Sequence, residues 1–369
     1  MTVMKFGGSC LSSREDIKKT VEIIKSEEIK EEVKDEGRPV IVLSAFKGVT
    51  DKLIAESKNA LAGSFKTDEI IKLHLDLTEG LSPKTKTAAQ KRICELQSEL
   101  ENTLLGVSYL KELSPKTLDK VMSFGERMAV HVISAHLIEE GFESHTLSDS
   151  EAGIITDSTY GNATIIDAAS RPLMKKKLQA GDSIPVVTGF IGRDEEGFIT
   201  TLGRGGSDYT ASYIASVLGC DAILWKDVAG LMTADPKIVK GARIIEKINY
   251  LDALELAHYG SKVIFEKAIL PAMKSGITLR IRDFLDTNRE GTSIGSEMSK
   301  AIAISSVKHA MMVDFYGYSS DMMLTISDLF REFSEHNIYP LLLTEASSCG
   351  ETSVNESTTR WASLRASRL

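Results

Sequence analysis

Long apolar runs are missing from this sequence: no stretch approaches the roughly 20 residues that a helix needs to cross a bilayer. Basic residues are not in excess either, because the 369-residue chain carries a formal net charge of −8. A general basic surface for nucleic acid is therefore excluded. The amino terminus also lacks a charged segment followed by the apolar core of a signal peptide. We expect a cytoplasmic protein that binds neither membranes nor nucleic acid.

Cysteine is scarce and dispersed along the chain. No two cysteines form a C-x-x-C pair, which argues against both a disulfide framework and a zinc site. Cys10 follows a glycine-rich turn, where a reactive thiol is conceivable, but we interpret it as a small side chain beside a crowded backbone. The four cysteines are Cys10, Cys94, Cys220 and Cys349.

Three well-known nucleotide-binding patterns are absent. The sequence has no G-x-x-x-x-G-K-[ST] motif, which excludes a P-loop enzyme. It has no H-R-D with D-F-G, which excludes a protein kinase. No complete G-x-G-x-x-G follows the first predicted strand, which argues against a dinucleotide-dependent dehydrogenase. Any nucleotide chemistry must therefore depend on other motifs.

Short apolar segments alternate with segments of helical period. Val40–Leu43 is an uninterrupted run rich in β-branched residues, as is typical of a strand covered on both faces. Strand, helix and strand at this spacing predict an α/β domain with a largely parallel sheet. The other expected strands are Val3–Phe6, Ile184–Val187 and Ala222–Trp225, and the expected helices include Leu118–Glu140 and Tyr209–Leu218, the latter ended by Gly219.

Two regions depart from this alternation. Thr67 to Leu113 is charged and mostly helical in period, which indicates a helical insertion on the sheet. After a Gly-, Thr- and Ser-rich stretch near Gly291 to Lys300, a βαβ pattern suits a small ferredoxin-like module. Its predicted elements are strands Ala301–Ser305, Met311–Phe315 and Ile338–Leu343 and helix Ser320–Asn337. We expect domains at residues 1–295 and 300–355 and an unassigned tail at 356–369.

Two glycine-rich turns carry the strongest functional signal. Lys5-Phe6-Gly7-Gly8-Ser9 and Gly203-Arg204-Gly205-Gly206-Ser207-Asp208 each follow an apolar run and precede a helical stretch. Backbone N–H groups at a helix start bind anions, and Lys5 or Arg204 adds a positive charge beside them. Two such turns are what phosphoryl transfer between two anionic groups requires.

A pair of opposite charges indicates an amino-acid ligand. The planar guanidinium of Arg204 suits a carboxylate, and Glu126, which opens an otherwise apolar helix, suits an ammonium. Together they would bind an α-amino acid zwitterion. A simpler interpretation of Glu126 is a favourable charge in the first helical turn, and Ser207 and Asp208 would equally serve as helix caps.

Two loops after predicted strands are further candidates. Ser44 and Thr50 flank the loop after the second strand, although Thr50 would also cap the next helix. The segment from Lys226 to Lys237 contains two acids, two lysines and a turn-forming Asp-Pro, so it would hold a ribose and phosphates or form a solvated turn. Lys262, followed by Val263, again pairs a lysine with a nearby glycine.

These motifs, in this order, resemble those of the aspartate kinases of the amino-acid kinase family. The resemblance covers roughly Val3 to Ile294, and residues from about Ser305 to Val354 resemble the first part of a regulatory ACT module. It implies a three-layer α/β fold and transfer of the ATP γ-phosphoryl to the β-carboxylate of L-aspartate, with Mg²⁺. The product, 4-phospho-L-aspartate, would enter lysine, threonine and methionine biosynthesis.

The resemblance also implies roles for individual residues. Lys5, Gly7 and Gly8 would stabilise the transferring phosphoryl and Asp208 would orient the lysines, and no dedicated metal ligand is implied. Aspartate would be held by Ser44, Thr50, Glu126, Arg204, Gly205, Gly206 and Ser207. The nucleotide would contact Lys5, Gly7, Gly8, Lys226, Asp227, Met232, Lys237, Lys262 and Val263.

Departures from the family pattern leave alternatives open. Met232, Lys237 and Phe265-Glu266 stand where many relatives have tyrosine, arginine and His-Pro, and only one partial ACT module is matched. We expect a homodimer, with a lysine or threonine effector left open. The alternatives are a kinase acting on glutamate, acetylglutamate or a nucleoside monophosphate, and a non-catalytic amino-acid sensor.

Overall fold

The computed structural model describes residues 1–34, 38–179, 183–260, 263–296, 303–305, 322–336, 339–340 and 364–365. The chain divides into two compact units. The large unit comprises Met1–Ala257 and Lys262–Ala303, and the small unit comprises His258–Ser261 and Ile304–Leu369. Each unit is described by itself.

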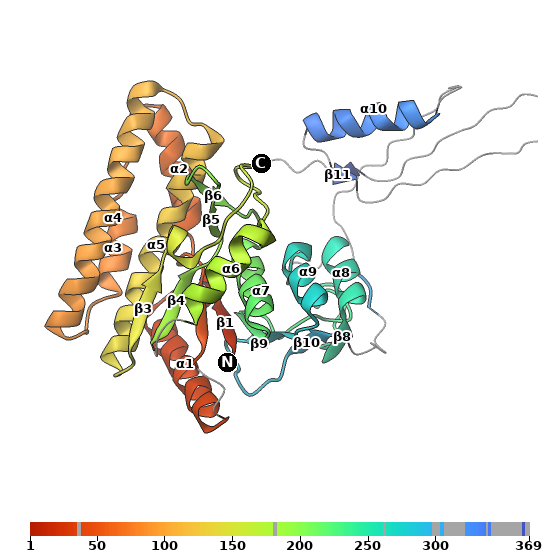
Figure 1. The fold of residues 1–369 in the computed structure, drawn as a ribbon, viewed down its shortest axis with the longest axis horizontal. Coiled ribbons are helices and arrows are strands. Elements are labelled where there is room, and N and C mark those ends of the chain that lie inside the picture. The colour runs from red at the N-terminus through yellow and green to blue at the C-terminus, as the bar shows by residue number, and fades with distance from the viewer. Residues whose placement is uncertain are drawn as a thin grey trace, which may run out of the picture. The chain divides into compact units, whose positions relative to one another are not determined.

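An eight-stranded sheet forms the centre of the large unit (Figure 1). Its strand order is β3-β4-β2-β1-β7-β9-β10-β8, and only the pairing of β9 with β10 is antiparallel. The predicted, largely parallel sheet is therefore confirmed. The strands are β1 (Val3–Phe6), β2 (Val40–Leu43), β3 (Ser144–Leu147), β4 (Ile184–Thr188), β7 (Ala222–Lys226), β8 (Lys247–Asn249), β9 (Leu279–Asp283) and β10 (Thr292–Gly295).

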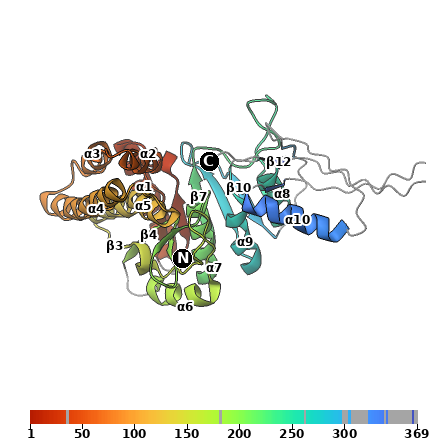
Figure 2. The same ribbon diagram turned by 90° about the horizontal axis from the view of Figure 1, so that it is seen from above.

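Helices cover both faces of the sheet, which gives the predicted three layers. Figure 2 shows α4 and α5 on one side of the strands and α6 and α7 on the other. One face carries α1 (Arg14–Lys34), α2 (Val49–Leu61), α3 (Asp68–Asp76), α4 (Pro83–Leu110) and α5 (Pro115–Glu139). The other carries α6 (Asp167–Leu178), α7 (Gly206–Leu218), α8 (Tyr250–His258) and α9 (Glu266–Ser275). No helix in the described ranges is both long and apolar enough to cross a bilayer.

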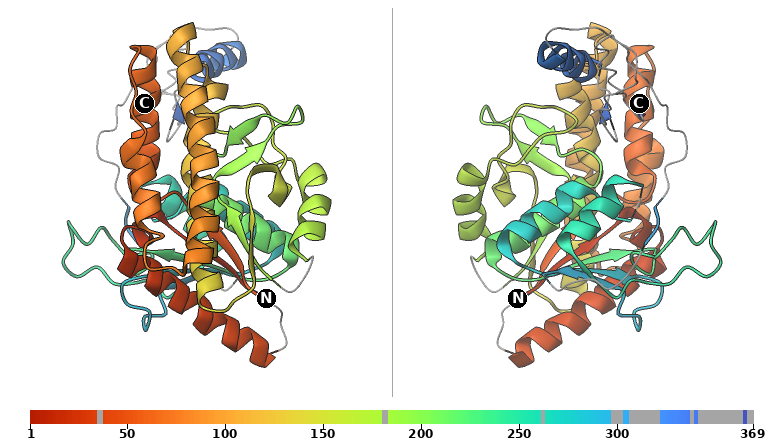
Figure 3. Two further views of the ribbon diagram at one scale, coloured as in Figure 1. Left: turned by 90° about the vertical axis from the view of Figure 1, so that its left-hand side faces the viewer. Right: turned by 90° about the vertical axis from the view of Figure 1, so that its right-hand side faces the viewer.

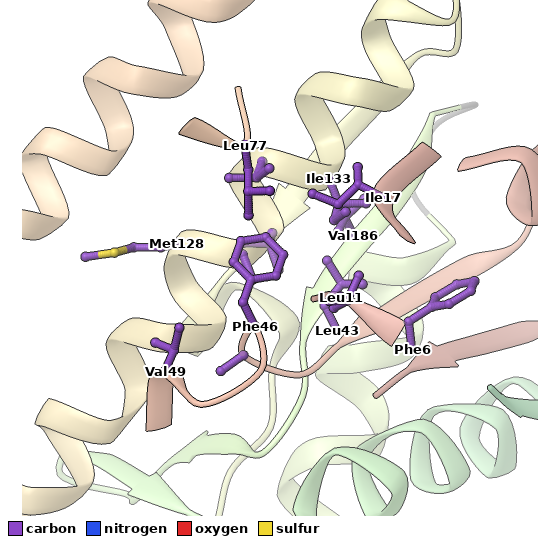
Figure 4. Packing of buried hydrophobic residues seen from close by; sticks show 14 of the residues in the cluster. Phe6, Leu11, Ile17, Leu43, Phe46, Val49, Leu77, Met128, Ile133 and Val186 are labelled. Atoms are coloured by element: carbon purple, nitrogen blue, oxygen red, sulfur yellow. The ribbon is translucent and has the colours of Figure 1, made fainter. Parts of the chain in front are cut away.

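Side chains alternate between two hydrophobic cores along each central strand, because successive residues of a strand point to opposite faces. In β1, Met4 and Phe6 belong to the core under α1 and α5, whereas Val3 belongs to the core under α7. Phe6, Leu43 and Val186 lie among the packed residues in Figure 4. The same alternation assigns Lys5 and Lys226 to the face covered by α7.

Most predicted elements of the large unit are present. The structure confirms the strands Val3–Phe6 and Val40–Leu43 without change and places Gly219 (φ 68°) at the end of α7. The expected helical insertion consists of the short helix α3 and the long helix α4, which lie among the orange helices in Figure 3. Short elements complete the unit: η1 (Gly8–Cys10), η2 (Asp149–Ala152), and a hairpin of β5 (Ile191–Arg193) and β6 (Ile199–Thr201).

The small unit is described only in part. The predicted helix is present as α10 (Met322–Glu335), in which the rings of Phe330 and Phe333 meet edge to face. β11 (Tyr339–Pro340) falls within a predicted strand and pairs with β12 (Leu364–Arg365), in the segment that the sequence left unassigned. The predicted strand Met311–Phe315 lies outside the described residues, and the described residues 303–305 form no strand.

Candidate active site

Four parallel strands end side by side at the centre of the sheet. The order β4-β2-β1-β7 makes them neighbours, and all four run in the same direction. The residues that follow them are Gly189, Ser44, Gly7 and Asp227. Ligands of open α/β sheets bind beyond the carboxyl ends of the strands, so this edge is the place where a site is expected.

A buried carboxylate links the two glycine-rich turns. The Nζ atom of Lys5 lies 2.7 Å from Oδ1 of Asp208, and Nζ of Lys226 lies 2.5 Å from Oδ2. Burial alone would raise the pKa of Asp208, but the charges of Lys226 and Lys5 outweigh it and hold the pKa at about 2. Burial lowers the pKa of Lys226, and Asp208 opposes that shift. The two lysines are thus fixed in place by one carboxylate.

The first glycine turn lies closely against its neighbours. A Cβ atom at Gly8 would lie 2.9 Å from the carbonyl oxygen of Ala45, and one at Gly7 would lie 3.3 Å from Nζ of Lys5. Side chains at either position would therefore displace the loop after β2 or crowd the ammonium. Gly7 is buried and its N–H donates to the Trp225 carbonyl at 3.3 Å, whereas Gly8 is half-buried. A backbone group beside a cation is what an anion site needs.

The second glycine turn begins α7. Gly205 has φ 71°, a left-handed conformation that suits glycine, and it directly precedes the first helical residue. Ser207 and Asp208 lie in the first helical turn, so they are not the caps that the sequence alternatively predicted. Backbone N–H groups of a first turn have no helical partner. The Arg204 side chain is exposed, and within the described part of the chain it forms no ion pair.

Glu126 is buried without a full set of partners. It lies well inside α5, which begins at Pro115 after the Ser114 cap, so the interpretation of a charge in the first turn is wrong. The side chain is 3% exposed, and Oε2 has no hydrogen-bond partner among the residues that the structure describes. Burial raises its pKa to about 8, although the Ala45 N–H and the charge of Lys5 lower it. A cationic ligand group would satisfy this carboxylate.

The loop after β2 lies between the first turn and α5. The N–H of Ser44 donates to the Phe6 carbonyl at 3.2 Å, which fastens the loop to the end of β1. Gly48 (φ 78°) precedes α2, so Thr50 lies in the first turn of that helix and is not its cap. The Ser44 and Thr50 side chains are half-buried.

The segment after β7 makes most of its contacts within itself. Met232 is half-buried and forms a bridge with Ile244, whereas Lys237 is exposed and its N–H donates to Asp235 in a turn. Of the predicted nucleotide contacts that the structure describes, Lys226 joins Lys5 in the cluster around Asp208. Asp227 is exposed, Val263 is half-buried, and Lys262 lies outside the described residues.

Comparison with known proteins places this geometry in a family. Residues 1–283 match the model of the amino acid kinase family. The chain belongs to this family. Aspartokinase 2, chloroplastic, of Arabidopsis thaliana is 35% identical over 353 residues, which cover 89% of this chain and 62% of that protein. Lysine-sensitive aspartokinase 3 of Escherichia coli K12 is 30% identical over 300 residues, covering 80% and 64%.

A solved structure has the same fold. Aspartokinase III of E. coli, in complex with aspartate and ADP, matches with a TM-score of 0.80 at 24% identity, covering 98% of this chain and 78% of that chain. The present chain spans 62% and 64% of the length of the Arabidopsis and E. coli relatives given above. It therefore shares the fold of the amino acid kinases along most of its own length.

Some residues at the site of this amino acid kinase escaped the sequence analysis. Asp119 is 1% exposed and binds the strand that leads to Arg204. Asp119 precedes Glu126 by seven residues, or about two turns of one helix. This spacing would have indicated that both carboxylates lie on the same side of α5. Thr188 is also buried at the end of β4, and its Oγ1 has no hydrogen-bond partner in the described part of the chain. The sequence gives no signal for it.

Cys10 was correctly interpreted as structural. Its thiol donates to the Trp225 carbonyl at 3.3 Å, and the side chain is fully buried. Burial raises the pKa of the thiol to about 11, although Lys5 lowers it. A reactive thiolate at neutral pH is therefore disfavoured.

Proposed function

We propose that this amino acid kinase is an aspartate kinase, which transfers the γ-phosphoryl of ATP to the β-carboxylate of L-aspartate. The observation that carries the proposal is the pairing of both Lys5 and Lys226 with Asp208, which joins the two glycine-rich turns. Similarity to proteins named aspartokinase supports aspartate as the acceptor. The product would be 4-phospho-L-aspartate, the start of lysine, threonine and methionine biosynthesis.

Lys5 and the Gly7 and Gly8 amides would stabilise the transferring phosphoryl group. The negative charge of that group increases on its peripheral oxygens during transfer, so a fixed ammonium and backbone donors would stabilise the transition state. Asp208 would hold both lysines without further reorganisation. The attacking carboxylate is ionised at pH 7, so no general base is required.

The acceptor would be held by both ends of its zwitterion. Arg204 would bind the α-carboxylate, assisted by Ser207 and the amides of Gly205 and Gly206 at the start of α7. Glu126 would bind the ammonium, since no described residue donates a hydrogen bond to its Oε2. An acylated amine would leave that carboxylate buried and unpaired, which favours aspartate over acetylglutamate. Ser44 and Thr50 would contact the remaining polar atoms of aspartate.

The nucleotide would extend along the segment after β7. Lys226 would approach the phosphates from its position beside Asp208, and the exposed Asp227 would suit a ribose hydroxyl. The remaining proposed contacts with the nucleotide are Met232, Lys237, Lys262 and Val263.

Mg²⁺ would accompany ATP and neutralise charge between its phosphates. The described residues include no group of three or more His, Cys, Asp or Glu side chains that would hold a metal ion. Asp208 is also already paired with two lysines. The ion would therefore be bound mainly through phosphates and water, which is the usual preference of Mg²⁺.

An acyl-phosphate trapping assay tests the proposal. The full chain is incubated with Mg-ATP, hydroxylamine and, in turn, aspartate, glutamate, acetylglutamate and uridine monophosphate. We expect hydroxamate to form with aspartate alone. Arg204→Ala should lower its rate of formation about a hundredfold or more. The control is Arg280→Ala, which changes a surface arginine paired with Asp221. Product with another acceptor, or unchanged activity in Arg204→Ala, would refute the assignment. ATP consumption coupled to pyruvate kinase detects transfer to uridine monophosphate.

We also propose residues 1–295 as the catalytic domain and 300–355 as a partial ACT-like module in a cytoplasmic homodimer. The E. coli relative is named a lysine-sensitive aspartokinase. Inhibition by lysine or threonine is therefore the relevant measurement, together with the mass of the native assembly. A rate unaffected by millimolar concentrations of either amino acid would refute an effector role.

A further inference from the structure

Asp119 is a buried carboxylate whose hydrogen bonds within the described residues come from backbone N–H groups and a hydroxyl and from no basic side chain. It lies in α5, and its side chain accepts the Thr201 N–H at 2.8 Å, the Thr201 Oγ1 hydroxyl at 2.8 Å and the Gly161 N–H at 2.9 Å. Burial raises its pKa, although the donors from Gly161 and Thr201 lower it. Burial of a charge is unfavourable, so a carboxylate at this position requires a specific reason.

The donors to Asp119 belong to the surroundings of the second glycine turn. Thr201 ends β6, three residues before Arg204. Gly161 belongs to a loop that lies against Gly203. A Cβ atom at Gly203 would lie 2.7 Å from Oδ1 of Asn162 and 3.1 Å from the Gly161 carbonyl oxygen. The loop also binds β6 directly through the Ala163 N–H and the Thr201 carbonyl at 2.9 Å. Asp119 therefore fixes both segments that support Arg204.

The helix that carries Asp119 also carries Glu126. Residues seven apart lie on the same side of a helix, separated by two turns, or roughly 10 Å along its axis. The hydrogen bonds of Asp119 thus join α5, which positions the proposed ammonium partner, to the turn that positions the proposed carboxylate partner. These two groups come from distant segments, and Asp119 is a direct polar connection between those segments.

We propose that Asp119 is a positioning residue that sets the separation between Glu126 and Arg204, and thereby the affinity for the amino-acid acceptor. This inference rests on the proposed function, because it concerns the same acceptor site. Asp119 would not touch the acceptor. Its effect would appear in the binding of the acceptor and not in that of the nucleotide, whose phosphates are held by Lys5 and Lys226.

The test compares Asp119→Ala with a matched control. Asp194 is also buried and belongs to the same hairpin, where it accepts the Phe198 N–H and the Tyr160 hydroxyl, each at 2.8 Å. It lies at the turn between β5 and β6, away from the end that leads to Arg204. We expect Asp119→Ala to raise KM for aspartate at least tenfold while KM for ATP changes less than twofold. Asp194→Ala should leave both KM values within twofold of wild type.

Two milder variants keep the inference testable if Asp119→Ala does not fold. In Asp119→Asn, the amide oxygen can still accept both backbone N–H groups, and the amide nitrogen can donate to the Thr201 hydroxyl. The KM of this variant for aspartate should therefore stay within threefold of wild type. Thr201→Val removes only the hydroxyl donor and should raise that KM about threefold. An unchanged KM in Thr201→Val would overturn the inference when Asp119→Ala cannot be assayed.

The possible failures are distinguishable. Suppose that wild type phosphorylates aspartate. If Asp119→Ala then changes KM for aspartate and KM for ATP equally, Asp119 has only a general structural role. The same conclusion follows if Asp194→Ala also raises KM for aspartate alone. If wild type phosphorylates none of the acceptors, the proposed function itself fails, and this inference fails with it.

Discussion

At the scale of single residues, Glu126 departs from the ordinary acid–base behaviour of a glutamate. Its carboxyl is buried, and its pKa of about 8 means that the ligand-free protein holds a proton there at pH 7. A bound ammonium would stabilise the ionised form instead. Binding of the acceptor should therefore release this proton.

We predict that aspartate binding at pH 7 releases close to one proton and weakens up to tenfold per unit as the pH falls below about 8. The reason is that Glu126 must lose its proton before it can pair with the ammonium. Calorimetric titration in buffers of different ionisation enthalpy measures the release. Glu126→Gln should bind more weakly and release no proton, and equal proton release in that variant would contradict the prediction.

Sequence patterns predicted the charges of the site better than their surroundings. Lys5, Arg204 and Asp208 lie in short motifs whose residue types already indicate anion binding. The contact between Lys226 and Asp208 depends on which face of its strand each residue occupies, so it follows only once the sheet is known. The desolvation of Glu126 likewise comes from packing around α5, which local sequence does not encode.

At the scale of elements, the packing of α5 against the loop after β2 depends on one glycine. A Cβ atom at Gly125 would lie 2.7 Å from Cβ of Ala45 and 3.3 Å from a methyl group of Val49. Gly125 therefore lets α5 approach the loop whose Ala45 N–H binds Glu126. This close approach compensates for the low helix propensity of glycine.

We predict that Gly125→Ala destabilises the protein by about 1–3 kcal/mol and raises KM for aspartate, because the added methyl group separates α5 from the loop. Gly106→Ala is the matched control: it also lies within a helix, α4, but has no atom within 4 Å of the added methyl group. That variant should be stabilised by up to about 1 kcal/mol. Urea denaturation measures both, and equal effects of the two substitutions would contradict this account.

Element boundaries show where sequence patterns were insufficient. The apolar runs of β1 and β2 determined those strands fully, since a strand buried on both faces has few alternatives. The start of α5 was placed three residues late, because Ser114 and Pro115 precede the apolar part of the helix. Glu126 lies inside both the predicted and the observed range of this helix, so the interpretation of a charge in its first turn did not fit the predicted helix either.

At the scale of the whole molecule, the buried His74 and Glu126 and the half-buried His131 differ in how their contributions to stability depend on pH. Burial lowers the pKa of His74 and of His131 to about 4 and raises that of Glu126 to about 8. The neutral histidines contribute stability above pH 6.5 that is lost as the pH falls towards 4. Protonated Glu126 contributes stability below about pH 4.5 that is lost as the pH rises to 8.

We predict that these groups make the ligand-free protein most stable near pH 6.5, since two histidines outweigh one glutamate below that value. Urea denaturation between pH 4 and 9 measures the free energy of unfolding. His74→Gln should flatten the acid side, with His336→Gln, which changes an exposed histidine directly after α10, as control. A profile in His74→Gln as steep as that of wild type would contradict the assignment.

The alternation of side chains along β1 and β7 has a consequence for how such a chain tolerates insertions and deletions. Losing or gaining one residue within β1 would turn the ammonium of Lys5 towards α1 and bring a large apolar side chain beside Asp208. A single insertion or deletion in β1 would therefore disrupt both the hydrophobic core and the charged cluster around Asp208. Length variation should therefore accumulate in regions such as the α3–α4 insertion, whereas the short strands that carry the lysines retain their residue count.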